Sequence, residues 1–193
     1  MATTKASATR TTILELAAQI ASTEGLEGLT IGRLAGELRM SKSGLFAHFG
    51  SKQELQIATI QVAAARFYGE VIAPTLGEPE GPARLRGYCE SYLDYMQREV
   101  FTGGCFWAAV ASEFDDRPGP VRDAIRDGLS GWLAELERQA RIAGAHDPAA
   151  LAFEIYSLGL GANTYSRLLT DEAAFDRARK AIERRLLVEQ AST

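Results

Sequence analysis

The chain has 193 residues, 46% of them hydrophobic and 24% charged, which can supply the core of one sizeable domain or two small ones. Apolar residues never run for the roughly 20 positions of a membrane span, and the first residues lack the apolar core of a signal peptide. We therefore expect a globular, cytoplasmic protein with no membrane partner. The two cysteines, Cys89 and Cys105, fit no CxxC spacing, so we predict neither a metal site nor a disulfide framework.

The formal net charge of −4 is unevenly distributed along the chain. Residues 1–52 carry six Lys or Arg against four Glu, a net charge of +2, which leaves −6 for the remainder. Only the N-terminal quarter is therefore suited to binding a polyanion such as a nucleic acid.

Helical periodicity runs through the whole chain, and no alternating segment flanked by hairpin turns indicates a strand. After a flexible tail of about residues 1–9, an apolar repeat from Ile13 predicts a first helix that Gly25 can end as a C-terminal cap. A second helix begins after the N-cap Thr30, and a third, very short helix begins after another N-cap candidate, Ser41. The sequence thus predicts three helices within about the first 50 residues.

A fourth helix is predicted over about residues 53–72, because residues 51–54 match the S-x-x-E capping box and Pro74 follows the helix. This helix is apolar on nearly all sides, which suggests a strut that packs against two bodies. A Pro- and Gly-rich loop, residues 74–82, follows this helix and separates it from the next one. We expect one domain over 1–52 and a second domain over 53–193, connected by this strut.

Five further helices complete an all-α fold of about nine. They are predicted near residues 85–96, 105–114, 120–143, 148–169 and 171–186. The last two are the expected dimer interface, because their small residues permit close helix approach and their apolar stripe is more than a monomer would cover. The small residues are Gly159, Gly161 and Ala162, and the stripe consists of Phe175, Ile182 and Leu186.

Only a tight turn separates the second and third predicted helices, and this arrangement predicts a helix-turn-helix. We expect Leu34, Leu38, Met40 and Leu45 to hold the two helices together. The other face of the third helix is then free to enter a DNA major groove. There Lys42 can donate to guanine, Ser43 can make adaptable hydrogen bonds, and Gly44 lets the backbone approach. The amides near Ser41 and the side chain of Lys52 are placed to hold phosphates.

The run ILELAAQIASTEGLEGLTIGRLAGELRMSKSGLFAHFGSKQEL, residues 13–55, resembles the N-terminal region of the tetracycline-repressor (TetR) family of transcriptional regulators. Its most specific part is Ser41 followed by LFAHF and then Ser51-Lys52. The resemblance covers about a quarter of the chain closely; beyond it only the length, the helix count and the stretch GGCFWAAVASEFDDRPGPVR are similar.

The resemblance implies that Lys42 and Ser43 face bases, that Phe46 lies against the DNA and that His48 lies along its backbone. The sequence departs from the family pattern in three ways. Phe46 is usually a tyrosine, and Arg39 stands in a turn where glycine is common, so a positive φ there would be strained. Ile31 and Ala47 stand where many relatives have polar groups that bind phosphate. The expected DNA-binding residues are Thr30, Arg33, Ser41, Lys42, Ser43, Gly44, Phe46, His48 and Lys52.

The family also implies a pocket for a small-molecule effector in the C-terminal three quarters, where aromatic side chains are concentrated. Each of these side chains packs in a core by default. The expected lining residues are Tyr88, Tyr92, Tyr95, Cys105, Trp107, Tyr156 and Asn163. Family members are typically homodimers, and the two recognition helices of such a dimer would lie about 34 to 36 Å apart and match a palindromic operator.

The predicted function is a homodimeric repressor, not an enzyme and without a cofactor, that a small, largely apolar or aromatic effector releases from DNA by displacing the strut. Two alternatives stay open: a DNA-binding regulator with a solid core and no effector, and an all-α enzyme. Asp115-Asp116 is similar to the acidic Mg²⁺ pair of all-α prenyl-diphosphate enzymes, but no third carboxylate follows at the needed spacing, and two prolines interrupt the helix.

Overall fold

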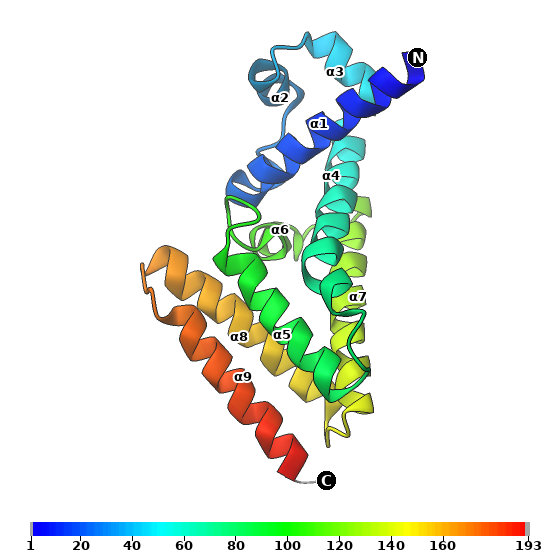
Figure 1. Cartoon of the computed structure of the whole chain (residues 1–193). Coiled ribbons are helices and arrows are strands. Elements are labelled where there is room, and N and C mark those ends of the chain that lie inside the picture. Colours follow the sequence, from blue (N-terminus) through cyan, green and yellow to red (C-terminus); the bar gives the residue numbers. More distant parts are fainter. Residues whose placement is uncertain (1, 192–193) are drawn as a thin grey trace. The chain divides into compact units, whose positions relative to one another are not determined.

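A computed structural model of the protein describes residues 2–191, with side chains from 8 to 189. Within that part the chain forms nine α-helices and no strand, which confirms the predicted fold class (Figure 1). None of these helices is both long enough and apolar enough to span a bilayer. The helices are α1 (Ala2–Glu24), α2 (Ile31–Glu37), α3 (Lys42–Phe49), α4 (Lys52–Phe67), α5 (Pro82–Gln97), α6 (Phe106–Phe114), α7 (Pro120–Ile142), α8 (Pro148–Leu168) and α9 (Ala174–Ala191).

The chain divides into two compact units. Unit 1 comprises Met1–Arg66 and Phe101–Asp127, and unit 2 comprises Phe67–Val100 and Gly128–Thr193. The helix predicted as a strut is α-helical up to Phe67 and continues as a π-helical turn over Tyr68–Ile72. The predicted division of function at residue 52 stays a prediction, since compact units and functional domains need not share a boundary.

The first helix starts earlier than its apolar repeat suggests. α1 begins at Ala2, within the segment expected to be a flexible tail, and Met1 lies outside the described residues. Residues 2–24 contain neither glycine nor proline, so no residue stops the helix from extending toward the N-terminus. At its other end Gly25 adopts a φ of 75° and caps the helix as predicted.

In unit 1, α6 packs along α1, and the turn before α6 meets α1 at very close range. The amide of Gly103 donates a 2.9 Å hydrogen bond to the hydroxyl of Ser22. A Cβ atom on Gly103 would lie 1.7 Å from the carbonyl oxygen of Ser22. Only glycine therefore fits this crossing of two backbones.

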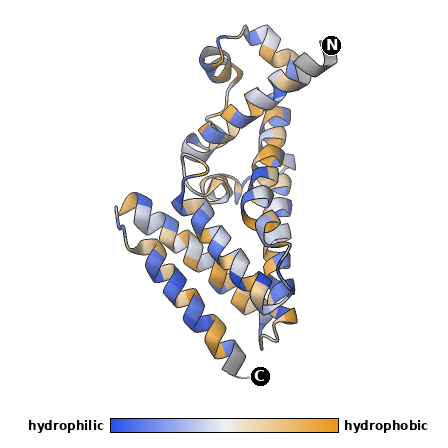
Figure 2. Cartoon of the chain, in the orientation of Figure 1, coloured by the Kyte–Doolittle hydropathy of each residue, from blue (hydrophilic) through white to orange (hydrophobic). Residues whose placement is uncertain are grey.

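In unit 2, α9 packs against α8 and α5, and this packing contradicts one prediction. Phe175, Ile182 and Leu186 were expected to be exposed, yet each is at most 7% exposed, because this side of α9 faces the other two helices. Gly159 likewise packs within unit 2, against the ring of Tyr92 on α5. Figure 2 shows apolar residues on other parts of α8 and α9 as well. The exposed large apolar side chains of α8, of the C-cap residue Leu169 and of α9 are Phe153, Tyr165, Leu168, Leu169, Leu187 and Val188.

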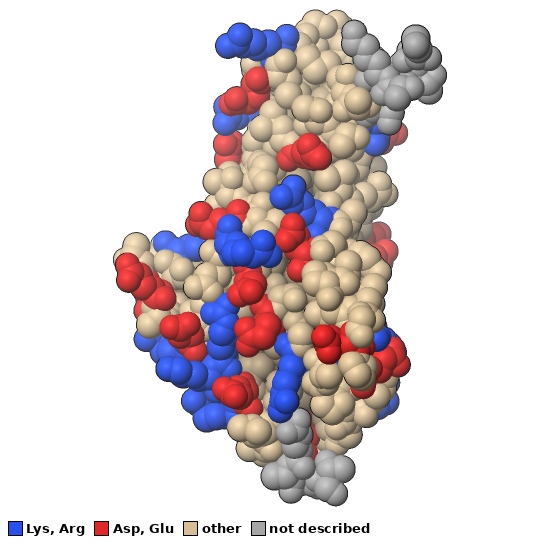
Figure 3. Space-filling model, viewed as in Figure 1, with Lys and Arg blue, Asp and Glu red and all other residues tan. Residues whose placement is uncertain are grey.

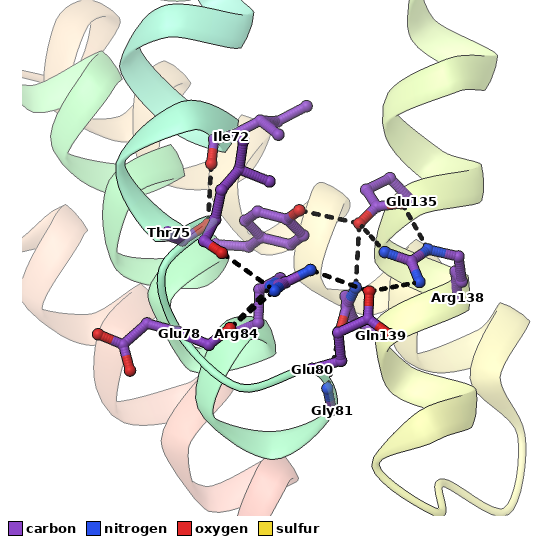
Figure 4. Close-up of polar contacts among 11 residues, drawn as sticks. Ile72, Thr75, Glu78, Glu80, Gly81, Arg84, Glu135, Arg138 and Gln139 are labelled. Carbon is purple, nitrogen blue, oxygen red and sulfur yellow. Dashed lines mark hydrogen bonds and ion pairs between the residues drawn. The ribbon is translucent and has the colours of Figure 1, made fainter.

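A polar network fixes the loop before α5 to α7 (Figure 4). The fully buried Gln139 accepts a 2.8 Å hydrogen bond from the amide of Gly81 and donates one of 3.0 Å to Glu135. The hydroxyl of Tyr88 donates to the same carboxylate at 2.8 Å, and Arg138 pairs with it. Burial opposes the charge on Glu135, but hydrogen bonds from Arg138, Gln139 and Tyr88 outweigh it and lower the pKa of this carboxyl.

Tyr88→Phe should lower the free energy of unfolding by about 1.5 to 3 kcal/mol at neutral pH, because it removes one hydrogen bond to a carboxylate. Burial, together with the charge of Glu135, raises the pKa of Tyr88 from 10.0 to about 12. Because folding raises the pKa of Tyr88, its contribution to stability is fully present at pH values below the pKa of the unfolded state. This contribution is lost as the pH rises through the pKa of the folded state. The advantage of wild type over the variant should therefore shrink between pH 10 and 12.

Urea unfolding of both proteins at pH 7 and near pH 11 measures this difference. The exposed Tyr68 serves as the control, since Tyr68→Phe removes a hydroxyl with no hydrogen-bond partner among residues 8–189 and should leave the free energy of unfolding at pH 7 unchanged. A Tyr88→Phe effect that is the same at both pH values would contradict the assignment.

Candidate nucleic-acid interface

The helix-turn-helix is formed by α2 and α3, and both predicted N-caps are confirmed. The hydroxyl of Thr30 accepts a 3.0 Å hydrogen bond from the amide of Arg33, and that of Ser41 accepts one of 3.0 Å from Gly44. Leu34 and Leu45 are fully buried where the two helices pack together. The caps and this apolar contact fix where α3 begins and which of its faces is left outside.

The turn between the helices has a backbone that glycine would adopt more easily. Arg39 has a φ of 52°, in the left-handed region. The next amide, that of Met40, donates to the carbonyl of Ala35 at 2.9 Å and closes the turn. The strain anticipated for a non-glycine residue is therefore present, at about 1 kcal/mol, and the surrounding contacts hold it in place.

The outer face of α3 carries groups that can contact DNA in a major groove. Lys42, Ser43 and Phe46 are exposed, Phe46 by 51%, whereas Phe49 is buried on the opposite face. Lys42 has no carboxylate partner among residues 8–189, and its side chain lies over Gly32 at the start of α2. A cation, a hydroxyl and an aromatic ring are thus presented together, and each can contact base edges or the thymine methyl group.

Two of the predicted DNA-binding cations already have carboxylate partners. Arg33 pairs with Glu24 at 3.1 Å and with Glu37 at 2.7 Å. Lys52 pairs with Glu27 at 2.9 Å, and its hydrogen bond lowers the pKa of that carboxyl. Because these ion pairs lie at the surface, each contributes only about 0 to 1 kcal/mol, and a DNA phosphate can compete for the cation. The predicted DNA contacts of both side chains stay predictions.

The loop before α2 is held by two residues that sequence analysis did not single out. The carboxylate of Glu113 on α6 accepts hydrogen bonds from the amides of Leu26 and Glu27 at 2.7 and 2.8 Å. The buried Gln56 donates to the carbonyl of Leu26 at 2.9 Å. Glu113 lies 87 positions from Leu26 in the sequence, so no local pattern could have indicated this contact.

The residues predicted to line an effector pocket fall in both units. In unit 2 they are Tyr88, Tyr92, Tyr95, Tyr156 and Asn163, and in unit 1 they are Cys105 and Trp107. All but the half-buried Tyr156 are buried. Burial raises the pKa of the Cys105 thiol to about 11, so this group is protonated and unreactive near neutral pH.

Two aromatic residues that the prediction omitted link the tyrosines of unit 2. The Phe67 ring centroid lies 5.2 Å from that of Tyr95 and 5.2 Å from that of Trp132. The indole of Trp132 in turn contacts Tyr88 and Tyr92, at 5.7 and 5.5 Å between centroids. Its buried N–H has no hydrogen-bond acceptor among residues 8–189. Such a donor destabilises the native state by about 1 to 3 kcal/mol unless another molecule accepts from it.

Comparison with protein families matches both parts of the chain. The model of bacterial regulatory proteins of the tetR family matches residues 13–59, and the model of the tetracyclin repressor-like C-terminal domain matches residues 81–182. The second match alone covers more than half of the chain. The chain belongs to the TetR family.

Solved structures of TetR-type regulators share this fold. A TetR-family regulator from Streptomyces coelicolor superposes with a TM-score of 0.83 at 22% identity, covering 96% of this chain and 97% of its own. AibR, in complex with isovaleryl coenzyme A and operator DNA, gives 0.71 at 19% identity, covering 90% and 95%. A regulator from Saccharomonospora viridis in complex with choline gives 0.76 at 21% identity, covering 92% and 94%. No curated protein matches the chain.

Proposed function

We propose that this TetR-family DNA-binding regulator is a homodimeric repressor that binds a palindromic operator and leaves it when a small, largely apolar or aromatic effector binds. The exposed face of α3, with Lys42 free of carboxylate partners among residues 8–189, is the observation that carries the proposal. The proposed regulator acts in the cytoplasm, where bacterial DNA lies. It acts as a transcription factor rather than as an enzyme. The exposed Asp115-Asp116 pair follows the end of α6, so no helix presents it as a metal site.

Fluorescence anisotropy with DNA flanking the protein's own gene tests operator recognition. We expect binding that is at least about 10³-fold tighter than to a random duplex of the same length and that weakens steeply with salt. Equal affinity for the flanking DNA and the random duplex would count against an operator at this place.

The dimer is proposed to form through a groove between α8 and α9. The groove has a volume of about 860 Å³, and Phe153 and Tyr165, both exposed, are among its lining residues. Figure 3 shows Lys and Arg side chains over α9, and Arg177, Lys180 and Arg184 line the groove. An apolar groove flanked by charged side chains is typical of an interface, and a two-fold axis would let two copies cover each other's grooves.

Phe153→Glu should convert the dimer to a monomer and, because both half-sites must be bound together, abolish tight operator binding. Phe153 is 68% exposed in the single chain, so the substitution should leave the monomer folded. Light scattering coupled to size-exclusion chromatography measures the mass. Leu76→Glu, at another exposed apolar residue that does not line the groove, is the matched control and should stay dimeric. A dimeric Phe153→Glu would place the interface elsewhere.

The effector is proposed to bind between the aromatic side chains of unit 2 and to accept a hydrogen bond from the indole N–H of Trp132. Two regulators of this fold hold small molecules, isovaleryl coenzyme A in one and choline in the other. The predicted lining residues Tyr88, Tyr92 and Tyr95 surround Trp132 and Phe67, and their rings must separate to admit a ligand.

A regulator without an effector is the second candidate, because these rings contact one another directly. A thermal-shift screen of small apolar and aromatic compounds separates the two. A ligand that binds only the native state raises the midpoint of unfolding and should also release DNA, whereas an effector-free regulator responds to none.

A further inference from the structure

The cations of the DNA-binding part of unit 1 fall into two groups. Arg33 and Lys52 are paired with carboxylates, although sequence analysis assigned both to DNA. Arg10, Arg39 and Lys42 have no carboxylate partner among residues 8–189. Lys42 lies on the recognition helix and Arg39 in the turn before it. Arg10 lies on α1, where neither the helix-turn-helix pattern nor the family resemblance assigns a function.

Arg10 is held against the last turn of α3. Its guanidinium carbon lies 5.1 Å from the centroid of the Phe49 ring, a cation–π contact. Beside this contact is a hollow of about 250 Å³, which Arg10, His48, Phe49 and Gln61 help to line. Because the planar guanidinium of the exposed Arg10 rests on the buried Phe49 ring, it loses little further freedom when it binds a ligand.

A DNA phosphate has the charge and geometry that this hollow accepts. Phosphates lie on both sides of a major groove, and contacts at both ends of a recognition helix fix its orientation. The amides near Ser41 are the expected phosphate contacts at the start of α3, whereas Arg10 and His48 lie at its end. We propose that Arg10, assisted by His48, binds a backbone phosphate of the DNA through bidentate hydrogen bonds. This inference rests on the DNA-binding function stated above.

One carboxylate that lines the hollow would repel an anion bound there. Glu54 also lines it, and an oxygen of its side chain lies 2.7 Å from where a Cβ on Gly50 would be, so it is turned toward the loop between α3 and α4. Because it is close to the proposed phosphate position without pairing with Arg10 in the described structure, Glu54→Gln should strengthen DNA binding. An unchanged affinity in Glu54→Gln would count against a phosphate at this position.

The test compares Arg10→Gln with Arg122→Gln by fluorescence anisotropy. The probes are a random duplex of about 30 base pairs, roughly three helical turns, and a duplex of equal length from DNA flanking the gene. Arg122 is exposed on α7 without a carboxylate partner among residues 8–189, so its variant removes the same charge away from α3. Titrations between about 50 and 200 mM salt give the slope of log affinity against log salt.

Arg10→Gln should weaken binding to both probes by the same factor, roughly three- to tenfold, and reduce the salt slope by about 0.9 for each subunit bound. Arg122→Gln should leave the slope unchanged, and Arg10→Lys should retain most of it. An unchanged slope in Arg10→Gln, with salt-sensitive binding by wild type, would overturn the phosphate site alone. Salt-insensitive or absent binding by wild type would overturn DNA binding as well.

Discussion

Gly103→Ala should lower the free energy of unfolding by about 3 kcal/mol, the largest effect that we expect of any single methyl group in this chain. The added Cβ would lie 1.7 Å from the carbonyl oxygen of Ser22 and 2.3 Å from its carbonyl carbon. Both are backbone atoms of α1, so no side chain can rotate to make room. The turn and α1 must separate, and the 2.9 Å hydrogen bond between Gly103 and Ser22 would be lost with their packing.

Urea unfolding measures this effect, with Gly131→Ala as the matched control. Gly131 lies inside α7, and a Cβ there would meet nothing within 4 Å. The control should be neutral or more stable than wild type by about 0.5 to 1 kcal/mol, because alanine favours helix. If Gly103→Ala were as stable as the control, the close crossing of the two backbones would be wrong.

Lys42→Ala should weaken operator binding by about 1 to 3 kcal/mol and relax the preference at one base pair of each half-site, because a base contact carries sequence information. Lys42 is exposed at the first turn of α3, where the N-terminal residues of a recognition helix contact base edges. Affinity for random duplex should change much less.

The comparison with Lys52→Ala sharpens this test. Lys52 begins α4 and pairs with Glu27, and its predicted contact is with a phosphate. Its loss should weaken operator and random duplex alike, without any change in base preference. Competition with single-base operator variants measures the preference. If Lys42→Ala also weakened every sequence by one factor, Lys42 would contact the backbone rather than a base.

Local signals in the sequence predicted the helix-turn-helix well. Thr30 and Ser41 cap their helices, and Gly25 ends α1, because each of these effects depends on a residue and its near neighbours alone. The two buried leucines of α2 and α3, Leu34 and Leu45, follow from helical spacing in the same way.

Contacts between distant segments could not be predicted from such signals. Periodicity finds an apolar stripe on α9 but does not say what covers it, so Phe175, Ile182 and Leu186 were assigned to a dimer interface although α5 and α8 bury them. The pairing of Arg33 with Glu24 and the capping of the loop before α2 by Glu113 likewise depend on how the chain folds back. The positive charge of Arg33 indicated a DNA contact, whereas the position of Arg10 beside α3 depends on the fold and no local sequence pattern indicates it.

Hydroxyl-radical footprinting of the DNA flanking the gene tests the central claim most directly. A two-fold dimer with one α3 helix in each of two successive major grooves should protect two equal segments, centred about 10 to 10.5 base pairs apart and related by a sequence palindrome. Protection of a single segment, or uniform weak protection with no dyad, would contradict recognition of a palindromic operator by a homodimer.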